Sequence, residues 1–442
     1  MMNWKKRWSG FIALTGALCA LPQPAFAAEE GASTLSSADM GFMAFAALMV
    51  FFMTPALGFF YGGMVKRKNT LNTIMMSMVA IGIIGVQWIL FGYSLSFGTD
   101  IGGIIGSGDW LGFHGVGLAA DPDFSETIPH LEFAVFQMMF AVITAAIISG
   151  SIAERVSFGA YCLLIFLWTT LVYDPLCHMV WASGGIIYEL GALDFAGGTV
   201  IHISSGVSGL VAALVLGRRR GYGIIPNIPH NVPYIILGGS IVWMGWFGFN
   251  SGCAIGSNDI MIAAFANTAA SSMMSFLVWT LLEWRIEHQV TLFGTLTGGI
   301  AGLVGVTPAA GFVEVWAALV IGAITSVVCF VAITVVKRKV GYDDALDAFG
   351  CHGVGGICGA LLTGIFATTS VNPDGADGLL YGNAAQMFPQ VVGVLTSIAV
   401  SVVMTFLILK AISLVTPLRV PEETEKAGLD LALHGEAAYM KF

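Results

Sequence analysis

The stretch DFAGGTVIHISSGVSGLVAAL, residues 194–214, has the length and apolar character of a membrane helix but places a histidine near its centre. A spanning helix needs about 20 mostly apolar residues. An ionisable side chain inside such a helix is costly and is a functional candidate by default. The stretch therefore predicts a buried membrane helix in which His202 has a specific role.

The composition of the whole chain is that of a polytopic helical membrane protein. Of its 442 residues, 57% are hydrophobic and only 10% are charged, whereas a soluble domain carries about 25% charged residues. The 56 glycines are dispersed among the apolar runs, where small residues let helices pack closely. We therefore expect an all-α membrane fold and no nucleic-acid partner.

The first residues have the form of a secretory signal peptide. The basic start KKR (5–7) precedes a short apolar run, and AFA (25–27) has the small-x-small form of a signal peptidase site. An uncleaved first helix is the alternative, but the apolar run is short and is broken by Pro22 and Pro24. We therefore expect residues 1–27 to be removed, which leaves the mature N-terminus outside the membrane.

Eleven apolar segments follow, and each is a candidate membrane span. They cover residues 40–65, 70–98, 130–152, 157–175, 195–216, 232–252, 258–281, 290–306, 312–336, 348–367 and 386–415. Because the N-terminus is expected outside, an odd number of spans places the C-terminus in the cytoplasm. The sequence thus predicts a membrane domain over residues 28–416 and a cytoplasmic tail over residues 417–442.

The distribution of charge supports this topology independently. After residue 27, every lysine and arginine falls at or near a loop or tail that the eleven-span arrangement places in the cytoplasm. The outer loops contain acidic residues, among them Asp100, Asp109, Asp121, Asp123, Glu126, Asp374 and Asp377, and no lysine or arginine. This is the pattern of the positive-inside rule.

Spans five and ten share a motif that indicates two inverted halves of five spans, followed by a final helix. The motif H-x-x-x-G-x-x-G begins at His202 in span five and at His352 in span ten. An inverted 5+5 repeat brings such helices together near the membrane midplane. The glycines lie on the histidine's own helix face and permit close approach there. An acidic residue precedes each motif, Asp194 in the first and Asp347 in the second.

Two histidines at equivalent positions favour a function, although a lone buried histidine is more often a satisfied core residue. Burial favours uncharged imidazole, which offers one hydrogen-bond donor and one acceptor. Two such rings can bond to each other and still present a face to a small neutral guest or a proton. No third metal ligand lies near in the sequence, and the six cysteines after residue 27 form no C-x-x-C pair. We expect no metal and no cofactor, and the loops carry no nucleophile–base set that would indicate an enzyme.

Motifs along the whole mature chain are more specific than the histidines alone. They are GFFYGGMVKRKN (58–69), FQMMFAVITAAIISGSIAERVSF (136–158), HMVWASGG (178–185), DFAGGTVIHISSGVSGLVAALVLGRRR (194–220), WMGWFGFNSGC (243–253), VGVTPAAGFV (304–313), DAFGCHGVGGICG (347–359) and LRVPEETEKAGLDLALHGEAAY (418–439). In this order they resemble the ammonium transporter (Amt) family, bacterial type, of the ammonium transporter/methylammonium permease/Rh superfamily. The resemblance implies a homotrimer in the bacterial inner (cytoplasmic) membrane, with one substrate pathway through each protomer.

The resemblance also implies a role for individual residues. Trp181 matches a tryptophan of the outer vestibule, where an indole face can hold a cation. Phe140 and Phe249 match two stacked phenylalanines that close the outer end of the pore. The other matched positions are the twin histidines His202 and His352, the helix-capping Asp194, and Phe136, Trp246 and Thr307 near the outer site or pore wall. From the residues alone, the aromatics could equally be core residues, Trp181 part of an interfacial belt and Asp194 a structural cap.

One position departs from the family pattern. Many members have serine where this chain has Cys253, and the serine hydroxyl accepts a hydrogen bond from the cation. A thiol accepts only weakly. We therefore expect either weaker ammonium binding at the outer site or a larger share of it carried by Trp181.

The implied function is ammonium transport, with methylammonium as an analogue. A charge at the bilayer centre costs about 2.5–3.5 kcal/mol on insertion scales, and phenylalanines with neutral histidines do not replace the hydration of ammonium. Ammonia makes far weaker demands, so we expect ammonium to be recruited at Trp181, deprotonated at the phenylalanine pair and passed on as ammonia, with coupled proton movement implied by the family. A passive ammonia gas channel of the Rh type and an ammonium sensor are the alternatives.

The cytoplasmic tail is included in the resemblance. It implies a regulatory segment that packs across the inner face of the trimer, where a PII-type signalling protein docks. The basic inner loop GRRRGYGIIPNIPHNVP (217–233) would contribute to such a surface. A solvated, disordered tail is the alternative.

Overall fold

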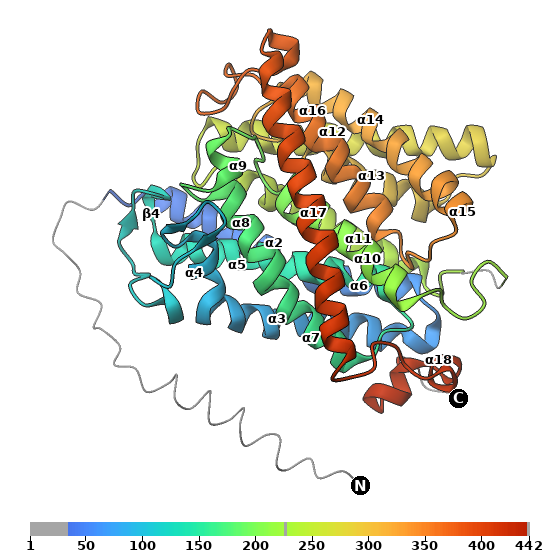
Figure 1. Ribbon diagram of the computed structural model, residues 1–442. Helices are drawn as coiled ribbons and strands as arrows, with labels where there is room; N and C mark the ends of the chain where they lie inside the picture. The colour runs from blue at the N-terminus through green and yellow to red at the C-terminus, as the bar shows by residue number, and fades with distance from the viewer. Residues whose placement is uncertain (1–33, 225–227, 440–442) are drawn as a thin grey trace.

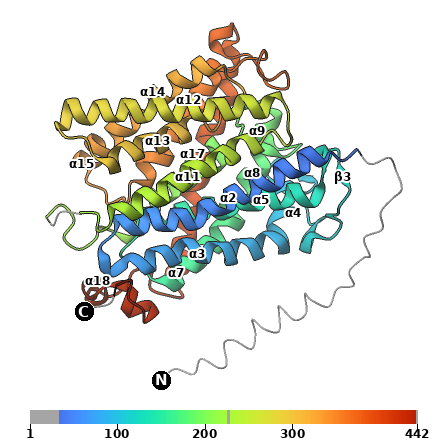
Figure 2. The ribbon, with the colours of Figure 1, turned by 180° about the vertical axis from the view of Figure 1, so that it is seen from behind.

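The computed structural model describes residues 34–224 and 228–439, and long apolar helices make up most of it (Figures 1 and 2). Within these residues, ten helices are long and apolar enough to cross a membrane. They are Ser37–Met64, Arg67–Phe97, His130–Ile152, Phe158–Glu189, Gly198–Leu216, Val232–Gly252, Asp259–Glu287, Val315–Val340, Phe349–Phe366 and Ala384–Ser413. A shorter apolar helix covers Leu292–Val306.

Regular α-helices form the body of these spans, and short π-helical turns continue several of them. The longer α-helices are α2 (Ser37–Met64), α3 (Thr70–Gln87), α5 (His130–Ile147), α7 (Phe158–Trp168), α8 (Asp174–Trp181), α10 (Ser204–Leu216), α11 (Val232–Gly252), α12 (Asp259–Leu282), α13 (Leu292–Val306), α14 (Val315–Val331), α16 (Val354–Phe366) and α17 (Met387–Ser413). The short ones are α4 (Tyr93–Phe97), α6 (Ser149–Ile152), α9 (Ile186–Glu189), α15 (Lys337–Val340) and α18 (Glu422–Ala427). The π-helical turns are η2 (Trp88–Gly92), η4 (Thr169–Tyr173), η5 (Gly198–Ile203), η6 (Glu283–Glu287), η7 (Ala332–Val336), η8 (Phe349–Gly353) and η11 (Asp430–His434). Such turns often occur at functional positions.

The observed helices confirm the mostly helical membrane fold, and ten of the eleven predicted spans coincide with a helix of spanning length. The predicted span 290–306 coincides with α13, whose 15 residues reach only about 22 Å at a rise of about 1.5 Å per residue. Eleven crossings, the inverted repeat and the orientation of the termini therefore stay predictions. The predicted signal peptide, residues 1–27, lies outside the described residues.

Two details of the predicted organisation were wrong. The fourth span does not end at residue 175, because the π-helical turn η4 carries the helix into α8, which ends at Trp181. Pro175 stands in the first turn of α8, where a missing backbone N–H leaves no helical bond unmade. The segment between the second and third spans also contains two small antiparallel hairpins, which the sequence pattern did not predict. Their strands are β1 (Asp100–Ile101) with β2 (Ile105–Gly106), and β3 (Ala120–Asp121) with β4 (Ser125–Pro129).

The helices pack so that segments far apart in sequence lie side by side. Helix α2 packs along α11, and α12 packs against both α13 and α14 (Figure 2). Helix α10 contacts η8, while α16 contacts η5, so the two histidine-bearing spans lie against each other. The long helix α17, red in Figure 1, packs against both α10 and α16.

Glycines bring the two histidine-bearing spans into backbone contact, as the shared motif predicted. A Cβ added at Gly206 would lie 2.2 Å from the backbone nitrogen of Gly353. A Cβ added at Gly356 would lie 2.9 Å from the carbonyl oxygen of Gly198 and 3.0 Å from Cβ of His202. Atoms cannot approach so closely, so only glycine allows this crossing at both positions.

Candidate functional site

The two histidines lie at the crossing point of the two spans, each on a π-helical turn. His202 belongs to η5 and His352 to η8, and both side chains are buried. Their Nδ1 atoms are 3.2 Å apart. Because one Nδ1 must donate and the other must accept, this bond cannot form when both rings are fully protonated. The Nε2 atom of His202 is buried and has no hydrogen-bond partner in the described part of the chain, so it can bond to a guest.

A continuous series of aromatic rings connects the histidines to Trp181. The His202 ring stacks on Trp246, with 5.3 Å between centroids, and on Phe249 at 6.0 Å. Phe249 lies 4.4 Å from Phe140, and Phe140 lies 6.4 Å from Trp181. The two phenylalanines form the close pair that the resemblance implied, although their planes are tilted by 55° and do not stack in parallel.

Phe136 and Thr307 hold this series of rings in place. The Phe136 ring lies 4.8 Å from the Phe140 ring and occupies the space that a side chain at position 252 would need. The indole N–H of Trp246 donates to Oγ1 of Thr307 at 2.9 Å. The Thr307 hydroxyl donates in turn to the backbone of its own helix at 2.8 Å. All four side chains are buried, so their positions are fixed by packing and by these two bonds.

Cys253 follows the C-terminal end of α11, the helix that carries Phe249. Its thiol donates to the carbonyl oxygen of Phe249 at 3.4 Å and is partly exposed. The thiol hydrogen is therefore engaged, which leaves the sulfur lone pairs free of this bond.

Asp194 forms hydrogen bonds both with Trp181 and with the start of the span that carries His202. Its carboxylate accepts hydrogen bonds from the start of the His202-bearing span, from the backbone N–H groups of Gly197 (3.1 Å), Gly198 (2.5 Å), Thr199 (2.9 Å) and Val200 (3.3 Å), and from the Thr199 hydroxyl. These are the N–H groups that lack partners at a helix N-terminus. The backbone carbonyl of Asp194 accepts the indole N–H of Trp181 at 2.8 Å. Burial raises the pKa of Asp194, and the hydrogen bonds it accepts oppose this shift.

Asp344 caps the His352-bearing span as Asp194 caps the His202-bearing span, whereas Asp347, the acidic residue that directly precedes the second motif, does not. Asp344 accepts from the backbone N–H groups of Phe349 (2.9 Å) and Gly350 (3.4 Å) at the start of η8. Asp347 instead accepts from Nζ of Lys337 at 2.5 Å. The spacing could have identified the capping residue, because Asp344 precedes His352 by eight residues and Asp194 precedes His202 by eight residues.

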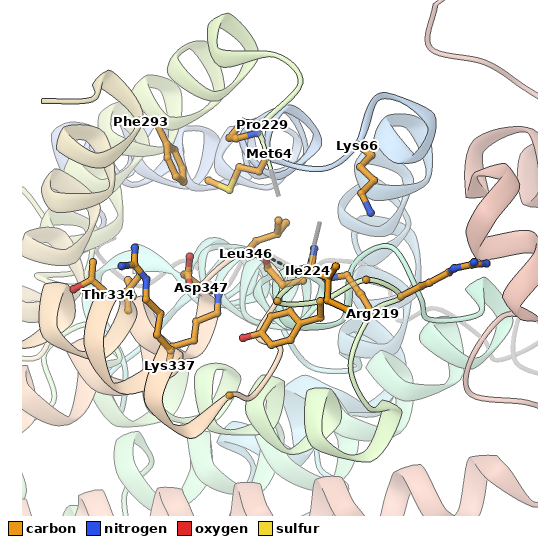
Figure 3. A pocket seen from close by; sticks show the side chains of 18 residues that line it. Met64, Lys66, Arg219, Ile224, Pro229, Phe293, Thr334, Lys337, Leu346 and Asp347 are labelled. Atoms are coloured by element: carbon orange, nitrogen blue, oxygen red, sulfur yellow. Dashed lines mark hydrogen bonds and ion pairs between the residues drawn. The ribbon is translucent and has the colours of Figure 1, made fainter. Parts of the chain in front are cut away.

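A cavity of about 690 Å³ opens at the end of the molecule where basic residues gather (Figure 3). Five of its lining side chains are cationic and one is a carboxylate: Lys66, Arg219, Arg220, Lys337, Arg338 and Asp347. Apolar residues such as Met64, Phe293 and Leu346 complete the wall, and Figure 3 shows Lys337 and Asp347 side by side.

Arg219 forms ion pairs with acidic residues of two other loops near this cavity. It bonds to Glu154 at 2.7 Å and to Asp343 at 2.8 Å, and all three side chains are buried. Burial alone would raise the pKa of Asp343, but the hydrogen bonds and charge of Arg219 outweigh it and lower the pKa. Loss of one partner would leave an uncompensated buried charge, which is strongly destabilising.

The tail packs against this same end of the molecule. Arg419 donates to Glu425 at 2.7 Å, and Glu425 accepts from the backbone N–H of Arg220 at 2.7 Å. Asp430 accepts from the backbone N–H of Asn72 at 2.9 Å. The described tail therefore contacts the start of α3 and the basic loop, whose Arg220 also lines the cavity.

The structure thus brings all ten predicted site residues into one connected group, running from Trp181 to His352. Comparison with known proteins points in the same direction. Residues 41–439 match the sequence profile described as Ammonium Transporter Family. An ammonium transporter of Bacillus subtilis is 52% identical over 402 residues, which are 91% of this chain and 98% of that protein.

Solved structures have the same fold. The crystal structure of Saccharomyces cerevisiae Mep2 superposes with a TM-score of 0.83 at 34% identity, covering 88% of this chain and 89% of that one. A structure named Sensor Amt Protein superposes with a TM-score of 0.83 at 28% identity, covering 90% of this chain and 98% of that one.

Proposed function

The chain belongs to the ammonium transporter family, and on this premise we propose that it transports ammonium across the bacterial inner membrane as a homotrimer. Ammonium is recruited at the outer face of Trp181 by cation–π attraction. It loses its proton next to Phe140 and Phe249, and ammonia passes the twin histidines. The proposal includes eleven membrane crossings, with the N-terminus outside and the C-terminus inside.

The observation that carries this proposal is the continuous contact from the partly exposed Trp181 through buried phenylalanine rings to His202, whose Nε2 has no partner in the described chain. Buried aromatic rings cannot replace the water around an ion, so the charged form is stopped at the ring pair. Ammonia can accept or donate a single hydrogen bond to the imidazole at a far smaller cost of dehydration.

We propose that the proton follows the ammonia along the histidine pair. The Nδ1–Nδ1 bond at 3.2 Å requires one ring to donate and the other to accept, so a proton entering one ring can leave from the other once the bond reverses. Currents in planar bilayers test this step. Ammonium gradients should produce a current, whereas a passive gas channel would produce none.

The transport function itself is tested by uptake of labelled methylammonium into sealed vesicles. We expect saturable uptake that ammonium inhibits and that a large excess of potassium leaves unchanged. Binding of ammonium without uptake would instead support a sensor, which is the second candidate because a protein named as a sensor shares this fold.

Replacing Cys253 with serine should tighten the apparent affinity for ammonium two- to tenfold. A hydrogen bond to a charged group contributes about 1.5–3 kcal/mol, and competition with water at a partly exposed site reduces this gain. The measurement is the concentration dependence of methylammonium uptake. The matched control is Cys162→Ser, because Cys162 is also partly exposed but lies in α7 outside the connected group of site residues. An identical half-saturation concentration in the parent and in Cys253→Ser would remove position 253 from the outer site.

We further propose that a PII-type trimer docks on the end of the molecule formed by the tail, the basic loop and the cavity. The bonds from Arg419 and Arg220 to Glu425 support this, because they hold the tail beside the basic loop. Membranes that contain the protein should retain the cognate PII-type protein and release it on addition of 2-oxoglutarate with ATP.

Deleting the residues after Pro421 should reduce this retention about tenfold or more, as expected when several charged contacts of an interface are lost together. A milder variant, Glu425→Gln, removes only the carboxylate that anchors the tail and should weaken retention in the same direction. Glu436→Gln is its control, because Glu436 is an exposed tail carboxylate. Full retention by the truncated protein would show that the tail is not part of the docking surface.

A further inference from the structure

The outer hairpin β1–β2 is fastened to the end of helix α8 by a group of contacts that we call the outer clasp. It consists of Asp100 and Gly103 on the hairpin, and of His178, Gly184 and Ile186 on or after α8. Nε2 of His178 lies 3.0 Å from Oδ1 of Asp100. The backbone N–H of Ile186 donates to the carbonyl oxygen of Gly103 at 2.9 Å. The Asp100 side chain also covers Gly184, where an added Cβ would lie only 2.7 Å from Cβ of Asp100.

The hydrogen bonds of His178 fix the orientation of its ring. Its Nδ1 lies 3.1 Å from the carbonyl oxygen of Ser96. A carbonyl oxygen can only accept, so Nδ1 donates there. The Nε2 atom then faces Asp100, and one hydrogen bond joins the imidazole to the carboxyl group. His178 is fully buried, whereas the Asp100 side chain is 31% exposed, and the hydrogen bond from His178 lowers the pKa of Asp100.

The contact between His178 and Asp100 lies next to the residue that would meet the substrate. His178 precedes Trp181 by three positions on α8, so the two side chains project from neighbouring turns. The helix ends at Trp181, and the backbone N–H of Ala182 bonds back to the carbonyl oxygen of His178 at 3.2 Å. Gly184, under the Asp100 side chain, is three residues beyond the indole. The outer clasp therefore contacts the chain both before and after Trp181.

Polar contacts lie on both sides of the His178 ring. Asp100 contacts one ring nitrogen, and the carbonyl oxygen of Ser96 contacts the other. Ser96 is itself fixed, because its hydroxyl donates to Asp174 at 3.4 Å.

We propose that Asp100 and His178 are positioning residues for the outer ammonium site, where the hydrogen bond between them holds the indole of Trp181 in the orientation that receives a cation. This inference rests on the proposed transport function. It assigns a role in substrate recognition to a hairpin that contributes no residue to the pathway itself.

The test compares the concentration dependence of methylammonium uptake for Asp100→Asn, His178→Gln and the double variant. We expect each single variant to raise the half-saturation concentration about tenfold, which corresponds to about 1.4 kcal/mol, while the maximal rate changes less than twofold. The double variant should be no worse than either single one, because both substitutions remove the same interaction. The control is Asp109→Asn, which removes a carboxylate from the same outer segment that bonds only to Thr99 and Ser107.

Three results would overturn the proposal. One is an unchanged half-saturation concentration with a lower maximal rate, which would place the pair in a later step. Another is an equal shift in Asp109→Asn, which would show that outer negative charge alone matters. The third is loss of both single variants from the membrane, which would make the pair a folding element. Failure of the parent chain to take up methylammonium would instead contradict the proposed function.

Discussion

Replacement of His202 or His352 by alanine should leave the protein in the membrane but lower methylammonium uptake at least tenfold. Each substitution removes one partner of the 3.2 Å bond between the rings and leaves the other imidazole buried with an unmet hydrogen-bonding atom, which costs about 1–3 kcal/mol. The space left by the ring can also admit water, so potassium should begin to compete with the substrate. Both effects follow from loss of an imidazole from a path lined mainly by aromatic rings.

The measurement is uptake into vesicles with and without excess potassium, after the amount of protein in each membrane has been matched. His114→Ala is the control, because it removes an exposed histidine in the outer segment. Parental uptake and parental selectivity in both alanine variants would contradict a role for the histidine pair in conduction.

Replacement of Asp194 by alanine should have the second large effect, a loss of both stability and transport. The carboxylate accepts four backbone N–H groups and one hydroxyl, and its removal leaves buried donors without partners at a cost of about 3 kcal/mol or more. The start of the His202-bearing span would shift, and with it the carbonyl that holds the Trp181 indole.

The matched comparison is Asp344→Ala, which frees only two backbone N–H groups and should cost about 1–2 kcal/mol. Thermal unfolding of the purified protein in detergent gives the order of the two variants, and vesicle uptake gives the functional loss. If Asp344→Ala proved as damaging as Asp194→Ala, the number of capped donors would not determine the effect.

The positions of the helices could be predicted from the sequence because each span is a long apolar run, and a membrane requires its backbone to bond internally. The outer hairpins could not be predicted in the same way. Their strands have two to five residues, too short for alternation to be visible. The fourth span was predicted to end at residue 175, but the helix continues through Pro175, because a proline in the first turn of a helical segment is tolerated.

The members of the site could be named from motifs, but their contacts could not. Nothing in the sequence states that Trp246 stacks on His202, or that the Trp181 indole bonds to the carbonyl of Asp194. These contacts depend on how the spans cross. The capping carboxylates show the same limit, because Asp347 is nearer to the second motif in sequence but Asp344 accepts from the N–H groups at the helix start.

The glycine contacts where the two histidine-bearing spans cross have a consequence for size discrimination. At Gly206 and Gly353 it is main chain that touches main chain, so the separation of the two histidines is set by covalent geometry and not by rotamers that could swing aside. Exchange of the imidazoles for other polar groups would alter which molecules are chemically accepted there, while the width between the two backbones stayed constant. The polar groups that select a molecule and the distance between the two backbones are therefore independent properties of this crossing. Each can be changed without changing the other.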